Sequence, residues 1–118
     1  MPGPYVFIDT DWAHHDVALE EQRWRHHIQY RRQWNDNRMI PLIRQAIRDP
    51  DEVYVSERNA RRVEIWRHFD DVKDGAPGLL QVIVEYDALI ASATSGDVKT
   101  AMVSTAVDSK GVRLWSRP

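Results

Sequence analysis

Apolar residues recur every three or four positions in two segments of the first half of the chain, residues 16–30 and 38–48. This spacing is typical of amphipathic helices. Asp16 can cap the first helix, and Pro41 lies in the first turn of the second, where proline is tolerated. The second helix should end before Pro50, because the residue that precedes a proline resists the helical conformation. The first half of the chain therefore predicts two helices.

After Pro50 the apolar residues alternate with polar ones, which is typical of half-buried strands. The predicted strands are residues 53–56, 63–69, 79–86, 97–105 and 112–115. The segments between them are short enough for hairpins, so we expect an antiparallel sheet, with loops at residues 70–78 and 88–96. A β-prone run at residues 5–9 precedes the helices as a first strand or an extended arm.

These elements predict the fold class α+β, with N-terminal helices packed on a four- to five-stranded antiparallel sheet. The chain has 118 residues, of which 42% are hydrophobic, and this is enough for a single domain with its own core. We expect that domain to span residues 1–118, with an N-terminal arm or strand at 1–18 and the core at 19–118.

The composition excludes several classes of site. The chain has no cysteine, so disulfides, thiolate zinc sites and a cysteine nucleophile are excluded. No apolar run is long enough to cross a membrane, and the N-terminus lacks the basic and apolar regions of a signal peptide. We therefore expect a protein that acts in the cytoplasm and has no membrane partner.

Charge is distributed unevenly along the chain, although the net charge is only −2. Residues 23–48 contain seven arginines and one acidic residue, Asp36. The planar guanidinium of arginine suits phosphate and carboxylate better than the point charge of lysine does, so this segment indicates a nucleic acid or another anionic ligand. The alternative is a solvated surface of arginines that binds nothing.

Five segments, in this order, resemble those of the phage-type barnase–EndoU–colicin–RelE-like (BECR) nucleases. They are Arg23–Arg32 with its His27-Ile28 pair, Ile43–Val53 with its Asp49-Pro50-Asp51 exit, the two strands Leu80–Val84 and Gly96–Ala101, and the closing piece Lys110–Trp115. The resemblance covers roughly residues 20–116. The family often has His-Pro-Glu shortly after its histidine–isoleucine pair. This chain has Arg32-Gln33-Trp34 there, so a second histidine is missing.

Members of this fold class are mostly metal-independent ribonucleases, and many act as toxins. The resemblance therefore implies a BECR/RNase-like fold and an endoribonuclease of the toxin type that cleaves RNA by 2′-OH attack. It implies RNA as the substrate and a cognate immunity or antitoxin protein as a partner. It also implies that the reaction uses neither a metal nor another cofactor.

Such a reaction needs a base for the 2′-OH, an acid for the leaving 5′-oxygen and cations for the phosphate. His27 is a candidate acid or base, because histidine titrates near neutral pH. Arg67 alternates with apolar residues, where a charge needs a partner or a function, so it is a candidate phosphate clamp. Thr100 matches the family's Val-x-Thr-Ala segment and is the third catalytic candidate. The alternatives are a half-buried histidine bonded to the sheet, an arginine paired with Glu85 or Asp87, and a threonine that serves only β-propensity.

Five further residues are candidates for binding the substrate phosphates: Arg31, Arg32, Lys99, Tyr54 and Ser56. We expect the helix face that carries His27 and these two arginines to lie beside the strands that carry Arg67 and Thr100. Alternation along the strand at 97–105 places Lys99 on the opposite face from Thr100.

Two other functions stay open. A catalytically inactive module of the same fold could bind RNA or protein, and the missing second histidine favours this interpretation. A DNA-binding basic helix ranks last, because the second helix has no helix-turn-helix partner. His14 and His15 lie near aspartates in the sequence, but we expect a polar surface there and no metal site.

Overall fold

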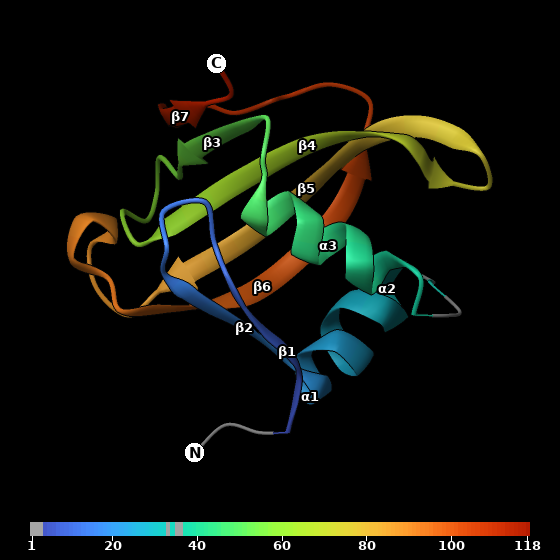
Figure 1. The fold of residues 1–118 in the computed structure, drawn as a ribbon, viewed down its shortest axis with the longest axis horizontal. Helices are drawn as coiled ribbons and strands as arrows, with labels where there is room; N and C mark the ends of the chain where they lie inside the picture. The colour runs from blue at the N-terminus through green and yellow to red at the C-terminus, as the bar shows by residue number, and fades with distance from the viewer. Residues whose placement is uncertain (1–3, 33, 35–36) are drawn as a thin grey trace.

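Seven strands form one mixed sheet in the computed structural model, which describes residues 4–32, 34 and 37–118 (Figure 1). The strands are β1 (Tyr5–Thr10), β2 (Asp16–Glu20), β3 (Glu52–Val55), β4 (Arg62–Lys73), β5 (Ala76–Tyr86), β6 (Ser95–Ser104) and β7 (Val112–Ser116). Their order across the sheet is β1-β2-β6-β5-β4-β3-β7. β2 pairs with β6 in parallel, whereas the other neighbours pair antiparallel.

The helices are short, and most lie between β2 and β3. One helical stretch combines α1 (Glu21–Arg23), the π-helix η1 (Trp24–Gln29) and α2 (Tyr30–Arg32). It is followed by α3 (Met39–Arg48), and a 3-10 turn, η2 (Ile90–Ser92), comes after β5. In the described part of the chain, no helix is long and apolar enough to span a membrane.

The predicted fold class, helices packed on a four- to five-stranded antiparallel sheet, is wrong. The described chain is mostly β, and its sheet has seven strands of mixed direction. The largest difference is Asp16–Glu20, which is β2 and not the first turn of a helix. Val17 and Leu19 are fully buried, and the strand pairs with β1 on one side and with β6 on the other. Pairing with strands elsewhere in the chain thus overrides the local helical spacing.

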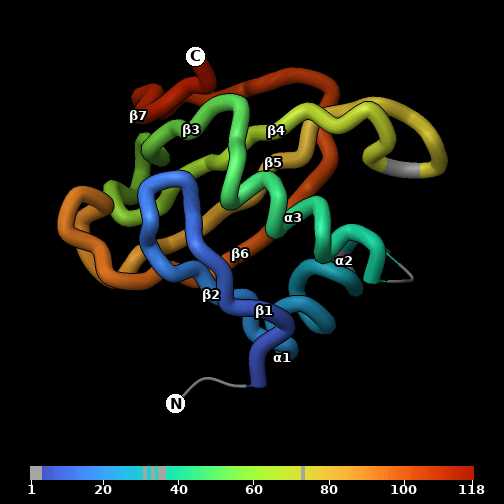
Figure 2. Tube along the Cα trace, viewed as in Figure 1, coloured from blue at the N-terminus to red at the C-terminus, as the bar shows by residue number. Residues whose placement is uncertain are grey.

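β4 and β5 are longer than predicted and form a hairpin that extends beyond the other strands (Figure 2). The loop predicted at residues 70–78 is mostly strand. Lys73 pairs with Ala76, so Asp74 and Gly75 are the two turn residues. Both have positive φ angles, 53° and 79°. Such a turn joins twisted antiparallel strands well, and Asp-Gly is one of its preferred sequences.

The core lies between α3 and one face of the sheet, where α3 crosses the strands in Figure 1. The buried residues of this core include Ile43, Ala46 and Ile47 of α3, Val63 and Ile65 of β4, and Val82 and Val84 of β5. Side chains alternate along a strand, so Glu64 and Ile83 point to the other side, together with Thr100, the partner of Ile83 on β6. We call this side, opposite α3, the open face.

Candidate active site

A cleft of about 380 Å³ lies at one end of the open face. Its lining residues are Arg23, Ser56, Arg62, Val63, Glu64, Ile83, Lys99 and Thr100. They come from α1, from β4, β5 and β6, and from the chain that leaves β3. Three of the residues predicted from the sequence, Ser56, Lys99 and Thr100, therefore line one cleft.

A β-bulge brings Lys99 and Thr100 to the same side. Ile83 pairs with Thr100 and Val84 pairs with Val98, so Lys99 is an extra residue in β6. A bulge interrupts the alternation of side chains and redirects them. The prediction that Lys99 lies on the opposite face from Thr100 is therefore wrong, since both line the cleft.

Glu85 anchors two cations of the cleft. Its Oε1 accepts a hydrogen bond of 2.7 Å from Arg62 Nε, and its Oε2 lies 4.0 Å from Lys99 Nζ. The hydrogen bond from Arg62, followed by the charges of Arg62 and Lys99, lowers the pKa of Glu85 against the opposing effect of its burial. Glu85 is therefore ionised at neutral pH and holds both cations at the cleft.

Arg23 and Glu64 are the two functional candidates that the sequence analysis missed. Arg23 makes no hydrogen bond or ion pair with any described residue, so its guanidinium is available to a ligand. Glu64 is half-buried, and its Oε1 is buried without a hydrogen-bond partner among the described residues. The polar position of Glu64 between Val63 and Ile65 was the available signal, because it predicts a side chain opposite the core face.

Arg32 connects the helical stretch to β6. Its Nε donates a hydrogen bond of 2.9 Å to the carbonyl oxygen of Ala101, and its Nη2 donates one of 3.4 Å to Thr100 Oγ1. The expected proximity of Arg32 and Thr100 is present. Arg32 thereby holds the Thr100 hydroxyl in place and satisfies a backbone acceptor of β6.

A family model described as phage-Barnase-EndoU-ColicinE5/D-RelE like nuclease2 matches residues 4–116. The chain belongs to this family. No curated protein and no solved structure matches it. The match extends from before β1 to the end of β7, so every lining residue of the cleft lies within the BECR-like nuclease unit.

Tyr54 of this BECR-like nuclease lies on β3 opposite Glu64, next to the cleft. Its hydroxyl donates a hydrogen bond of 3.1 Å to Glu52 Oε1. Burial, followed by the neighbouring Glu52 carboxylate, raises the pKa of Tyr54. Tyr54 is therefore neutral at physiological pH. Of the remaining phosphate-binding candidates, Arg31 belongs to α2, but its side chain lies outside the described part of the structure.

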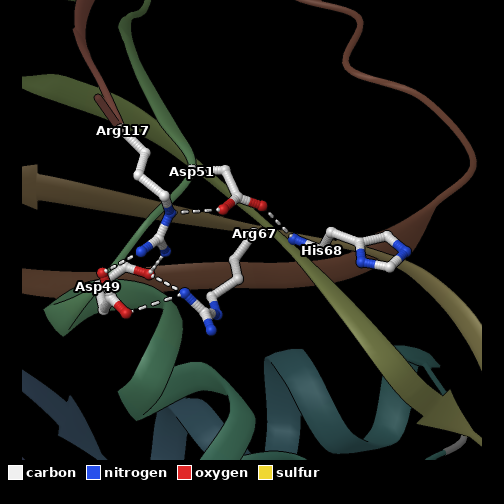
Figure 3. Close-up of polar contacts among 5 residues, drawn as sticks. All are labelled: Asp49, Asp51, Arg67, His68 and Arg117. Atoms are coloured by element: carbon white, nitrogen blue, oxygen red, sulfur yellow. Dashed lines mark hydrogen bonds and ion pairs between the residues drawn. The ribbon is translucent and has the colours of Figure 1, made fainter.

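Arg67 does not reach the cleft of the nuclease. It faces the core side of β4, where Nη1 donates hydrogen bonds to the carbonyl oxygen of Asp49 and, at 3.1 Å, to its carboxylate (Figure 3). The acidic partner of Arg67 is thus Asp49, whereas the sequence analysis considered Glu85 and Asp87. Arg67 and Thr100 lie on opposite faces of the sheet and do not form one site.

His27 is exposed on η1 and is not among the residues that line the cleft. Within the residues that the nuclease structure describes, no cluster of His, Asp and Glu side chains is arranged to hold a metal ion. His15 and Asp11 contact each other instead, with 3.2 Å between His15 Nδ1 and Asp11 Oδ2. The cleft on the open face is therefore the best-supported candidate active site.

Proposed function

We propose that the protein is a metal-independent endoribonuclease whose active site is the cleft on the open face. The observation that carries this proposal is that Arg23, Arg62 and Lys99 line one cleft together with Glu64, whose Oε1 has no hydrogen-bond partner among the described residues. Cations that surround a carboxylate suit a phosphodiester, because they bind the phosphate and stabilise the charge that develops on it.

In this proposal the 2′-oxygen of the ribose attacks the adjacent phosphorus. Glu64 accepts the 2′-OH proton, the bond from O2′ to phosphorus forms, and the bond from phosphorus to O5′ breaks. Lys99 donates a proton to the leaving 5′-oxygen. The products are a 2′,3′-cyclic phosphate and a 5′-hydroxyl, so no water or metal enters the step.

The remaining groups of the cleft bind the phosphate. Arg23 and Arg62 neutralise its non-bridging oxygens, since guanidinium forks match phosphate geometry. Thr100, held by Arg32, donates its hydroxyl to one of them. His27 lies on the helical stretch that supplies Arg23, so in this proposal it contacts RNA outside the cleft.

The test is cleavage of total RNA or tRNA by the purified protein in EDTA. Lys99→Ala and Glu64→Gln should each lower the rate by ~10²–10⁴-fold, the range for loss of an acid or base. The exposed residues Lys110 and Glu57 offer matched controls, Lys110→Ala and Glu57→Gln, which should keep the wild-type rate. His27→Ala, compared with His26→Ala, tests the exposed histidine in the same assay.

Two further observations would complete this test. Cleaved RNA should carry 2′,3′-cyclic phosphates, and an oligonucleotide with a 2′-deoxyribose at the cleavage site should stay intact. RNA that remains whole with the wild-type protein, or cleavage that stops in EDTA, would contradict the proposal.

We further propose a toxin-type effector that acts in the cytoplasm and is held inactive by an acidic immunity or antitoxin protein. The cationic cleft supports this, because an acidic surface complements it. Wild-type expression should arrest growth, and Glu64→Gln should remove the arrest. Growth arrest of equal strength with both proteins would contradict this role.

A second candidate is a catalytically inactive module that binds RNA. It is favoured by the bonds of Arg32 to Ala101 and Thr100, because Arg32 stands where the family often has a second histidine and here holds protein groups. Tight RNA binding without any cleavage would select this candidate.

A further inference from the structure

A second hollow lies on the open face beyond the cleft. It has a volume of about 730 Å³, and its lining residues are His68, Pro77, Gly78, Leu79, Val103, Ser104 and Thr105. Leu79 pairs with His68 of β4 on one side and with Ser104 of β6 on the other. The hollow therefore spans the same three strands as the cleft.

The register places the two hollows on one face. Each of the central residues of the second hollow is four positions from a residue of the cleft: His68 from Glu64, Leu79 from Ile83, and Ser104 from Thr100. An even separation along a strand keeps two side chains on the same side. Four residues of strand correspond to about 13 Å. One linear ligand that runs along the strands can therefore reach both.

The chemistry of the second hollow differs from that of the cleft. Among the side chains that the structure describes, no lysine or arginine lines it. An acidic side chain lies beside it, since Asp70 Oδ1 is 4.0 Å from His68 Nδ1. This carboxylate repels a phosphate. The hollow therefore does not suit a second phosphate of the substrate.

The walls suit a flat, uncharged ring. Leu79 and Pro77 are apolar, and the His68 imidazole is 54% exposed at its side chain, so it is free to stack. Figure 3 shows the His68 ring directed away from Asp49 and Arg67, while its backbone N–H donates to Asp51. The hydroxyls of Ser104 and Thr105 add polar groups at the edge. Unstacked nucleobases bind by this combination of ring stacking and edge hydrogen bonds.

We propose that the second hollow binds a nucleobase of the RNA strand whose scissile phosphate occupies the cleft. This inference rests on the proposed function and adds the form of the substrate. The two hollows are about 13 Å apart along the strands. An RNA that fills both places one base in the second hollow, where that base can neither stack on its neighbours nor pair with a second strand. The substrate is therefore single-stranded at that base.

The test measures binding of a fluorescent single-stranded hexanucleotide in which every ribose is 2′-O-methylated, which prevents cleavage. A second set carries one abasic site at each position in turn. With the wild-type protein, removal of one particular base should weaken binding about 5- to 150-fold, the range for loss of one stacked base. The other abasic sites outside the cleft should have small effects.

His68→Ala and Leu79→Ala should weaken binding of the intact oligonucleotide by a similar factor. They should leave the affinity for the critical abasic oligonucleotide unchanged, because the contact is already absent there. His26→Ala and Leu89→Ala are matched controls at exposed positions outside the hollow and should bind like the wild type. Since the His68 side chain is exposed, its removal leaves no buried cavity, and this variant should fold even if Leu79→Ala does not.

The inference would be overturned if His68→Ala lost as much affinity for the critical abasic oligonucleotide as for the intact one. It would also be overturned if His68→Ala lost no affinity for the intact oligonucleotide. A wild-type protein whose affinity does not depend on any single base would overturn it as well. The proposed function fails differently. Base-dependent binding together with intact unmodified RNA would overturn the ribonuclease and leave the base site standing. A wild-type protein that binds no RNA would overturn both.

Discussion

Asp11 is a buried acidic residue whose carboxylate accepts hydrogen bonds from the groups around it. Only 3% of the residue is exposed. Its carboxylate accepts hydrogen bonds of 2.8 Å from the backbone N–H groups of Ala13 and His15, and one of 2.6 Å from the Tyr86 hydroxyl. A buried charge is costly unless it is hydrogen-bonded in this way. These bonds attach the turn between β1 and β2 to the end of β5.

Tyr86→Phe should lower stability at neutral pH and flatten its alkaline dependence. Loss of the hydroxyl removes one donor from buried Asp11, which should cost about 1–3 kcal/mol. Burial, and then Asp11, raises the pKa of Tyr86 above its unfolded value of about 10. This stabilisation is complete below about pH 10 and is lost as the pH rises further, since only the unfolded chain then releases the proton.

Urea unfolding between about pH 8 and 11 measures both effects. Tyr30→Phe is the matched control, because Tyr30 is 79% exposed. Equal alkaline slopes for the wild type and Tyr86→Phe would show that Tyr86 does not carry this dependence.

β6 is the strand on which the position of the cleft depends most. Its described pairing with β2 covers only Ser95–Asp97, so from Thr100 onward no strand of the described chain lies beside it on that side. Arg32 supplies a donor there, to Ala101. An unpaired edge invites pairing with another chain, and a charged side chain on it opposes this. Through Arg32, the helical stretch thus opposes pairing of β6 with another chain and also fixes the Thr100 hydroxyl.

Arg32→Ala should reduce kcat more than it changes KM, because it leaves Thr100 in the cleft but no longer oriented. We expect a loss of about 10-fold, the equivalent of ~1.4 kcal/mol. Arg32→Lys should not restore the rate, since one ammonium cannot reproduce the two directed bonds of the guanidinium. Steady-state kinetics on a short RNA measures this, with Arg25→Ala as the control on an exposed part of the same helical stretch. Wild-type kcat in Arg32→Ala would exclude the positioning role.

The C-terminal segment crosses the sheet from β6 to the β7 edge. The chain leaves β6, passes β5, β4 and β3 in the strand order, and adds β7 beside β3. Arg117 then bonds to Asp49 and Asp51, in the exit segment of α3 (Figure 3). Arg67 binds the same Asp49 from β4. The Asp49-Pro50-Asp51 segment is therefore the point at which helix, sheet and C-terminus meet.

Arg117→Ala should loosen β7 without unfolding the sheet. The free energy of unfolding should fall only slightly, because the charge-assisted hydrogen bonds that disappear lie at a solvent-exposed site. Limited proteolysis should then cut the segment between β6 and β7 faster than in the wild type. Arg113→Ala is the matched control on β7, since Arg113 contacts Glu52, at 3.7 Å, and Tyr54 of β3 but neither Asp49 nor Asp51 among the described residues. Unchanged cleavage of that segment in Arg117→Ala would show that Arg117 does not hold β7 in place.

Features with a local physical cause were predictable from the sequence. The stripe of Ile43 and Ile47 predicted α3 to within a residue of its bounds, and Pro50 predicted its end. The alternation along β4 and β5 predicted both strands and the placement of Arg67 on the apolar face. The order of short motifs indicated the BECR nuclease family, which the family match confirms.

Other features depend on segments far apart in the chain. Asp16–Glu20 is a strand because β6, about 80 residues later, pairs with it. Lys99 joins Thr100 because the register against β5 creates a bulge. Glu64 lines a cleft because α3 covers the other face of β4. Local periodicity thus determined which residues alternate, whereas only strand pairing and helix packing decided which face became the core and which became the candidate active site.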